Sequence, residues 1–258
     1  MILNFSKYQG TGNDFILIDN RKGDVPPLDV AKLCHPKFGI GADGLMLLQN
    51  KADYDFEMIY YNSDGNVSSM CGNGGRCIVD FAKKLGVFEG KTTRFLAVDG
   101  PHEANWDNHH VELHMKDVND IESFNADAIL NTGSPHYVAF ITDLNFDLLT
   151  WAKGIRYNER FKQDGINVNA VKPIDQFSLS VRTYERGVEN ETLSCGTGVT
   201  ASALAYAQKQ GLPEGQYKIK IETPGGHLEV KFTLQDQIFQ SVYLCGPATE
   251  VFTGQIVV

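Results

Sequence analysis

Alternation of hydrophobic and polar positions runs through most of the chain and predicts a protein built mainly from β-strands. The pattern is clear over 2–8, in the apolar run 15–18 and again from 92 to 116. Two segments break it with apolar residues at helical spacing: one directly follows Cys71, and the other, rich in alanine, directly follows Cys195. The small residues of the second helix indicate that it is enclosed on most sides. The strands and these two helices together predict an α+β protein.

The two predicted helices begin in the same way. Cys71 and Cys195 each open a Cys-Gly-X-Gly sequence, and they lie 195 − 71 = 124 positions apart in a chain of 258 residues. We therefore expect two pseudo-symmetric β-rich domains, each a mostly antiparallel sheet or barrel wrapped around a central helix, with the active site in the cleft between them. The polar, acidic composition around 117–130 places the boundary there, which divides the chain into 1–118 and 119–247.

Composition narrows the possible functions. The net charge of −9 and an isoelectric point near 5.2 argue against a nucleic-acid-binding protein, which needs basic patches. No run reaches the ~18 apolar residues of a membrane span, and the first residues lack a signal-peptide pattern, so a cytoplasmic protein is expected. The five cysteines form no Cys-x-x-Cys pair, and two of the histidines share a strand face with a lysine. Neither a disulfide framework nor a metal site is therefore predicted.

The two cysteines suggest acid–base chemistry at carbon. A cysteine at a helix start is expected to have a lowered pKa, because the helix dipole and the N–H groups of the first turn favour the thiolate. Two thiols that share a site do not both ionise easily, so one acts as base and the other as acid. Such a pair can remove a proton from one face of a carbon and return one to the other face.

A substrate carboxylate is expected at the same helix starts. Backbone N–H groups there attract negative charge, and the glycines are expected to let the substrate approach the backbone closely. A carboxylate next to the reacting carbon also takes up the charge that develops in the transition state. The N–H groups concerned belong to Gly72, Asn73, Gly196 and Thr197.

A family resemblance follows from these motifs and their order. Together with Glu185-Arg186-Gly187, the two Cys-Gly-X-Gly segments closely resemble diaminopimelate epimerases, the cofactor-independent enzymes of lysine and cell-wall precursor synthesis. The resemblance covers the whole chain, and its further motifs are Gly12-Asn13-Asp14-Phe15, Gly41-Ala42-Asp43-Gly44-Leu45, Asn62-Ser63-Asp64-Gly65, Pro135-His136, Pro224-Gly225-Gly226 and Thr249-Glu250-Val251-Phe252. The chain departs from the family pattern at Ser134 and Gly44, and in a slightly longer spacing between Arg186 and Cys195.

The resemblance implies a specific set of site residues. Cys71 and Cys195 are implied to be the acid–base pair acting on LL- and meso-diaminopimelate, and His136 and Glu185 to assist the protonation of the thiols. Asn13 and Glu185 are implied to hold the amino group at the reacting carbon. The distant amino-acid end of the substrate is assigned to three further residues: Asn62, Asn167 and Arg186. The resemblance also implies no cofactor, a homodimer, and a C-terminal strand in 248–258 that returns to the first domain.

Other functions stay open at this point. A proline-racemase-like enzyme on the same scaffold also uses two cysteines, but it is not expected to need Arg186 and three asparagines for a second amino-acid end. The phenazine-type isomerases resemble the same fold and lack the cysteine pair. A thiol redox or ligand-binding protein is the alternative from another class, with Cys71 and Cys77 as a regulatory pair. Turnover of disulfide substrates without proton exchange at carbon distinguishes it from an epimerase.

Overall fold

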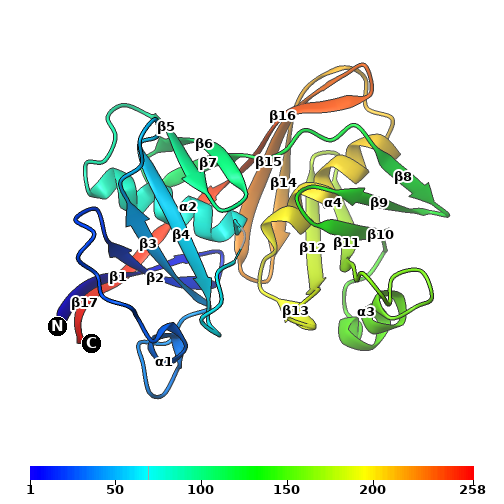
Figure 1. The fold of residues 1–258 in the computed structure, drawn as a ribbon. Helices are drawn as coiled ribbons and strands as arrows, with labels where there is room; N and C mark the ends of the chain where they lie inside the picture. The colour runs from blue at the N-terminus through cyan, green and yellow to red at the C-terminus, as the bar shows by residue number, and fades with distance from the viewer. Residues whose placement is uncertain (69) are drawn as a thin grey trace. The chain divides into compact units, whose positions relative to one another are not determined.

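The computed structural model describes residues 1–68 and 70–258 and divides the chain into two compact units. Unit 1 comprises Met1–Leu113 and Gly246–Val258, and unit 2 comprises His114–Cys245. Each unit is a run of hydrogen-bonded strands with one long helix packed against them, as Figure 1 shows. The predicted α+β class is confirmed.

In unit 1 the strands pair in the order β17-β1-β2-β3-β4-β5-β6-β7. Their bounds are β1 Ile2–Gly10, β2 Asn13–Asp19, β3 Gly44–Gln49, β4 Phe56–Asn62, β5 Thr92–Ala97, β6 Gly100–Asp107, β7 His110–His114 and β17 Thr249–Val257. Helix α2 (Gly72–Lys84) follows β4 and contacts β1, β2, β3 and β6. The short α1 (Val30–Cys34) lies between β2 and β3 in the chain, and its N-cap Asp29 accepts a hydrogen bond from the N–H of Lys32.

In unit 2 the order is β8-β9-β10-β11-β12-β14-β15-β16, and the short β13 pairs with β12. The bounds are β8 Ile121–Phe124, β9 Asp127–Asn131, β10 Pro135–Phe140, β11 Asn167–Asp175, β12 Ser178–Glu185, β13 Asn190–Thr192, β14 Gly215–Thr223, β15 Gly226–Gln235 and β16 Ile238–Pro247. Helix α3 (Leu148–Arg156) follows β10, and α4 (Gly196–Lys209) follows β13. Helix α4 contacts strands β9 to β12, β14 and β15.

The two units repeat one plan of strand pairing. Counting from β1, successive pairs in unit 1 are antiparallel, parallel, antiparallel, parallel, antiparallel and antiparallel. Counting from β9, the pairs of unit 2 follow the same series through β10, β11, β12, β14, β15 and β16. The helices fall at matching points, because α1 and α3 precede the third strand of each series and α2 and α4 precede the fifth. The two units thus share one plan of strand pairing and helix placement.

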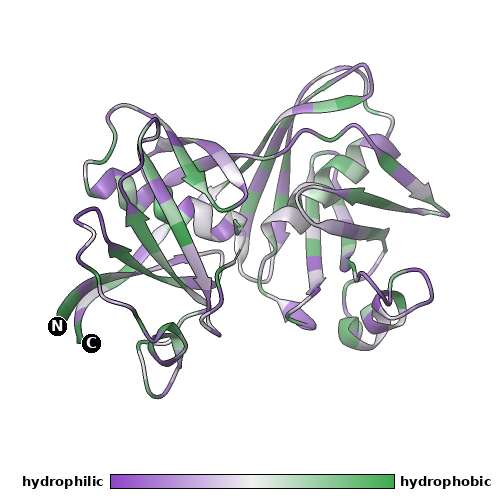
Figure 2. Ribbon diagram, in the orientation of Figure 1, coloured by the Kyte–Doolittle hydropathy of each residue, from purple (hydrophilic) through white to green (hydrophobic). Residues whose placement is uncertain are grey.

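The two long helices are buried along most of their length. In α4 the alanines at 201, 203, 205 and 207 are all buried, which confirms the expectation of an enclosed helix. Around them lies a core of valine, leucine and isoleucine side chains from the strands of unit 2. In unit 1, strands β2 and β3 are coloured mainly as hydrophobic in Figure 2 and are buried along most of their length. Small residues on the helices let these strands pack closely on them.

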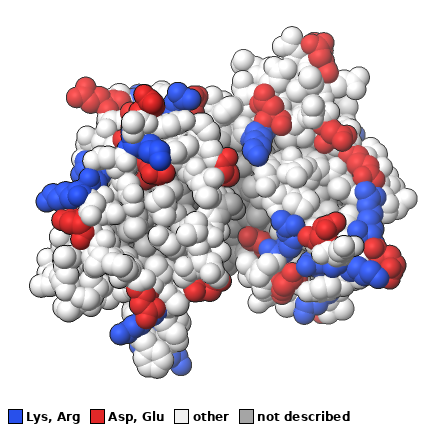
Figure 3. Space-filling view, viewed as in Figure 1, with Lys and Arg blue, Asp and Glu red and all other residues white. Residues whose placement is uncertain are grey.

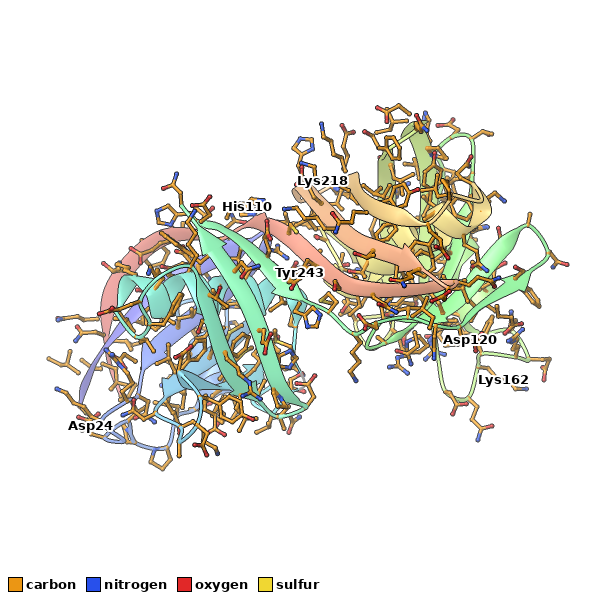
Figure 4. The ribbon with its side chains drawn as sticks, turned by 90° about the horizontal axis from the view of Figure 1, so that it is seen from above. Asp24, His110, Asp120, Lys162, Lys218 and Tyr243 are labelled. Carbon is orange, nitrogen blue, oxygen red and sulfur yellow. The ribbon has the colours of Figure 1, made fainter. Side chains whose placement is uncertain are left out.

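The boundary between the two units lies close to the expected one. Unit 2 begins at His114, whereas the expected boundary follows residue 118. The residues between belong to unit 2 because the N–H groups of Met115 and Val118 donate to the carbonyls of Val242 and Phe239. Strand β7 alternates buried and half-buried residues as expected, and His110, labelled in Figure 4, belongs to its half-buried face. Of the helices in the described part of the chain, none combines the length and apolar character needed to span a membrane.

Candidate active site

The expected site residues of each unit lie in a row across the ends of three neighbouring strands. In unit 2 the register pairs His136 of β10 with Asn167 of β11, and Val168 with Tyr184 of β12, so Glu185 continues the row. In unit 1 the register pairs Phe15 with Gly44 and Gly44 with Asn62, and Asn13 lies two residues before Phe15 at the start of β2. Residues far apart in the sequence are thus gathered at one sheet edge in each unit: Asn13 and Asn62 in unit 1, and His136, Asn167 and Glu185 in unit 2.

Each long helix starts beside that edge with its cysteine as the N-cap. Cys71 has φ −106° and ψ 126°, and Cys195 has φ −116° and ψ 112°, so both caps are extended. The first helix hydrogen bonds run from the N–H of Gly75 to the carbonyl of Cys71, 2.7 Å, and from the N–H of Val199 to that of Cys195, 2.8 Å. The N–H groups of the residues between point out of the helix end, where the dipole favours an anion.

The second glycine of each Cys-Gly-X-Gly segment packs into its own unit. An added Cβ at Gly198 would lie 2.5 Å from Oδ1 of Asn169, and one at Gly74 would collide with the methyl of Met46. Close packing against neighbouring side chains is therefore one reason for glycine at these two positions, and the approach of a substrate to the backbone there stays a prediction.

In unit 1 the side chain of Asn13 connects Cys71 to a carboxylate. The amide Nδ2 of Asn13 donates to Oδ2 of Asp43 at 2.5 Å, and the thiol of Cys71 donates to Oδ1 of Asn13 at 3.5 Å. Because a carboxylate only accepts, Asp43 settles which end of the amide faces the sulfur. Asp43 is held in turn by the N–H of Asp14 at 3.1 Å, and Asp14 forms an ion pair with the buried Lys7 at 2.7 Å.

A buried arginine supports the start of α2. Arg76 is fully buried, and its guanidinium donates to Oγ1 of Thr11 at 3.1 Å and to the carbonyl of Gly72 at 3.4 Å. Thr11 donates to Oδ1 of the buried Asn73 at 3.4 Å and adopts φ +50°, a left-handed conformation that is uncommon for threonine. The hairpin tip before Asn13 and the first turn of α2 are therefore connected through side chains.

In unit 2 Cys195 is 8% exposed and contacts the hydroxyl of Thr197, 3.5 Å from its sulfur. Nε2 of the buried His136 lies 2.9 Å from the same hydroxyl. Burial, with a smaller contribution from the charge of Arg186, lowers the pKa of His136 to about 3, so the ring is neutral at physiological pH. His136 and Cys195 are thus connected through the hydroxyl of Thr197, and the neutral ring places no positive charge beside the sulfur.

Asn167 and Arg186 are joined to one another. Oδ1 of Asn167 accepts from the backbone N–H of Arg186 at 2.8 Å, and its Nδ2 donates to the hydroxyl of Ser134 at 2.9 Å. The Arg186 guanidinium donates to the carbonyl of Asp164 at 2.9 Å, and its side chain is exposed. An exposed guanidinium beside amide and hydroxyl groups is suited to bind a carboxylate.

The turn that follows Arg186 is held by Glu189. Its carboxylate accepts from the hydroxyls of Tyr157 and Tyr184, both at 2.9 Å, and forms an ion pair with Arg156 at 3.1 Å. Burial alone would raise the pKa of Glu189, but these partners and the N–H of Gly187 hold it below its ordinary value. Charges of both signs gather over α3 and β13 in Figure 3, and several pair with one another.

Two of the remaining cysteines are poor nucleophiles. Burial raises the pKa of Cys34 to about 11, and it raises that of the fully buried Cys77 further. Cys77 lies on the buried face of α2, as expected for a core residue. A thiol with such a raised pKa is almost wholly protonated near pH 7, which argues against a regulatory role for these two cysteines.

Sequence reasoning missed three supporting residues and assigned no role to a fourth. Asp43, Arg156 and Glu189 are the missed ones, and each acts on a predicted site residue or on the turn that carries one. Asp43 lies inside a motif that carries the family resemblance, so its position was a usable signal. Asn169 shares a strand face with Asn167, and this alternation was the only sign of its part beside His136.

Comparison with known proteins places the chain among its relatives. The family model described as diaminopimelate epimerase matches residues 5–120 and 128–251. A diaminopimelate epimerase of Flavobacterium psychrophilum is 51% identical over 255 residues, covering 97% of this chain and 98% of the relative. One from Chlorobaculum tepidum is 41% identical and covers 96% and 98%.

Solved structures with low sequence identity share the fold. A phenazine biosynthesis protein from Bacillus anthracis superposes with a TM-score of 0.79 at 11% identity, covering all of both chains. A hydroxyproline epimerase from Agrobacterium vitis superposes with a TM-score of 0.70 at 13% identity, covering 99% of this chain and 91% of the other. At these identities the likeness extends to the fold and not to the substrate.

Proposed function

Since the chain belongs to the diaminopimelate epimerase family, we propose that it interconverts LL- and meso-diaminopimelate through proton transfer by Cys71 and Cys195. The observation that supports this most directly is the repeated helix start, in which a cysteine is the N-cap of the long helix in each unit. One thiolate removes the α-proton, the other thiol donates a proton to the opposite face, and no cofactor takes part. The reaction serves the synthesis of lysine and of peptidoglycan precursors.

The other predicted site residues follow from the chemistry of the substrate. We assign the amino group at the reacting carbon to Asn13 and Glu185, and its carboxylate to N–H groups at the helix starts, those of Gly72, Asn73, Gly196 and Thr197. The distal carboxylate and amino group are assigned to Asn62, Asn167 and Arg186. The hydrogen bond from the N–H of Arg186 to Asn167 supports a joint role for these two residues.

Proton exchange at the α-carbon tests this proposal. Under reducing conditions in D2O, NMR is expected to show exchange and inversion of LL-diaminopimelate by the wild type. Cys71→Ala and Cys195→Ala are expected to lose inversion, while Cys34→Ala, which removes a buried thiol of raised pKa, keeps it. No exchange in the reduced wild type would refute the two-thiol mechanism and favour a redox or binding function. Exchange with free proline and not with diaminopimelate would support the two-thiol mechanism but refute diaminopimelate as the substrate.

We further propose a homodimer in the cytoplasm. The first strand and the C-terminal strand of unit 1 carry exposed apolar side chains, including Ile2 at 63%, Val251 at 55% and Phe252 at 47%, which suit a contact with a second copy. Light scattering is expected to give a mass near twice 28.6 kDa. A mass of 28.6 kDa at micromolar protein would reject the dimer.

A further inference from the structure

The hydrogen bonds behind Cys195 run in one direction, and we propose that they make the hydroxyl of Thr197 a donor to the Cys195 sulfur, with Asn169 as the positioning residue that sets this direction. This hydrogen-bond chain runs from Thr183 through Asn169, His136 and Thr197 to Cys195. The inference rests on the proposed function, since it concerns how one of the two thiols is kept ready to act as a base.

A backbone carbonyl orients the amide of Asn169. Nδ2 of Asn169 lies 3.0 Å from the carbonyl oxygen of Tyr137, which only accepts, so the nitrogen and not the oxygen points that way. The hydroxyl of Thr183 donates to Oδ1 of Asn169 at 2.9 Å, in agreement with this orientation. Asn169 is fully buried, so water does not compete for either end of its amide.

The oriented amide selects the tautomer of His136. The second N–H of Nδ2 points at Nδ1 of His136, 3.1 Å away, so Nδ1 must accept. The ring is neutral because burial lowers its pKa to about 3, and a neutral imidazole whose Nδ1 accepts carries its proton on Nε2. His136 therefore donates from Nε2 to Oγ1 of Thr197 over 2.9 Å.

The hydrogen bond from His136 in turn orients the hydroxyl of Thr197 toward the sulfur of Cys195. Because Oγ1 of Thr197 accepts from His136, the hydroxyl hydrogen points away from the ring. The sulfur of Cys195 lies 3.5 Å from Oγ1 and can accept this hydrogen. A donor aimed at sulfur stabilises the thiolate relative to the thiol, since a hydrogen bond to a charged group is stronger than one to a neutral group.

The hydrogen bond of Cys71 has the opposite direction, because its sulfur faces an acceptor and not a donor. Its thiol donates to Oδ1 of Asn13, and Asp43 holds the amide in the orientation that presents this acceptor. An acceptor beside sulfur favours the protonated thiol. The two cysteines therefore have hydrogen-bond partners of opposite sense, as a pair with one base and one acid requires.

Two measurements on the free full-length protein test the inference. Nitrogen-15 NMR of the protein labelled at its seven histidines, with His136→Gln used to assign the signal, is expected to show His136 as the neutral Nε2–H tautomer from pH 5 to 8. The rate of Cys195 alkylation by iodoacetamide, followed by mass spectrometry against pH, reports the thiolate. In Thr197→Val its midpoint is expected to move up by about one pH unit, which slows alkylation roughly tenfold below the midpoint.

Three further variants separate the hydrogen-bond chain from a general packing effect. Thr197→Ser retains the donor and is expected to keep the wild-type midpoint. Thr200→Val removes another buried hydroxyl of α4, which donates to the carbonyl of Gly196 at 2.9 Å, and is expected to change nothing. Asn169→Leu is expected to raise the midpoint although it does not touch the sulfur.

Each contrary result would overturn a stated part. An imidazolium or Nδ1–H signal from His136 would refute the proposed direction of the hydrogen bonds from Asn169 to Thr197. This test needs no substitution of Asn169. A wild-type midpoint in Thr197→Val, or an equal rise in Thr200→Val, would remove the donor role of Thr197. A folded Asn169→Leu with a wild-type midpoint would remove the role of Asn169. Neither measurement uses substrate, so failure of the epimerase assay leaves these outcomes readable.

Discussion

Replacing Gly198 by alanine is expected to destabilise unit 2, although alanine is the better helix former. The new Cβ would lie 2.5 Å from Oδ1 of Asn169 and 3.3 Å from both Cε1 of His136 and Oγ1 of Thr183. None of these neighbours can retreat easily, because all three are buried and hydrogen-bonded to one another or to Thr197. Overpacking of this kind costs about 1–3 kcal/mol, against about 1 kcal/mol gained in helix propensity.

Gly154 supplies a matched control in the same unit. It lies within α3, and an added Cβ there meets nothing within 4 Å, so Gly154→Ala is expected to gain up to about 1 kcal/mol. The two variants are then expected to differ by roughly 1–3 kcal/mol in the free energy of unfolding, or about 4–8 °C in Tm for a 2 kcal/mol difference. Urea and thermal unfolding followed by circular dichroism measure both. Equal stability of the two variants would show that α4 shifts away from Asn169 at no cost, which would refute the reasoning.

Three other predictions concern charged or polar partners. In Asp43→Asn the amide of Asn13 loses its fixed orientation, so kcat/KM for diaminopimelate is expected to fall about tenfold, and an unchanged value would show that Asp43 does not act through Asn13. Glu189→Gln leaves Arg156 without its ion pair, so unfolding at pH 7 is expected to be easier by about 1–3 kcal/mol. Because the folded pKa of Glu189 is lowered, that deficit should shrink below about pH 4 as the carboxylate is protonated, and a deficit independent of pH would contradict the charge argument. His136 is neutral when folded and titrates near pH 6.5 when unfolded, so the wild type should lose up to about 1.4 kcal/mol per pH unit below pH 6.5, and His136→Gln should show a flatter dependence in urea unfolding.

The sequence was most informative where a pattern repeats along the chain. The two cysteine helix starts and the strand-rich halves were predictable because hydrophobic periodicity and cap residues act over a few positions. The extents of the shorter helices were not. The apolar side chains at 146, 149, 151, 152 and 155 predict a helix over 145–160, whereas the observed helix spans Leu148–Arg156, because Asp147 caps its start and the chain turns after Tyr157. The sequence also predicts a short helix over 28–33, and the observed one spans Val30–Cys34 for a similar reason, with Asp29 as its cap.

The supporting side chains were out of reach because their partners are distant in the sequence. Asn13 and Asp43 are 30 positions apart, and His136 and Thr197 are 61 apart, so neither pairing leaves a periodic signal. Glu189 adopts φ +55° in a turn that local propensity does not specify, and only the structure shows the hydroxyls and the guanidinium that surround it. Register across the strands, set by the whole sheet, brings these groups together.

The pairing of β17 with β1 has a consequence for the order in which the protein matures on the ribosome. Strand β1 is made first, yet its partner β17 is translated after every residue of unit 2. Unit 2 is one continuous stretch and can complete its hydrogen bonds as soon as Cys245 emerges, while unit 1 waits with one edge of β1 unpaired. Unit 1 therefore finishes folding after unit 2, and a chain truncated after Cys245 should protect unit 2 from proteases while leaving unit 1 open to them.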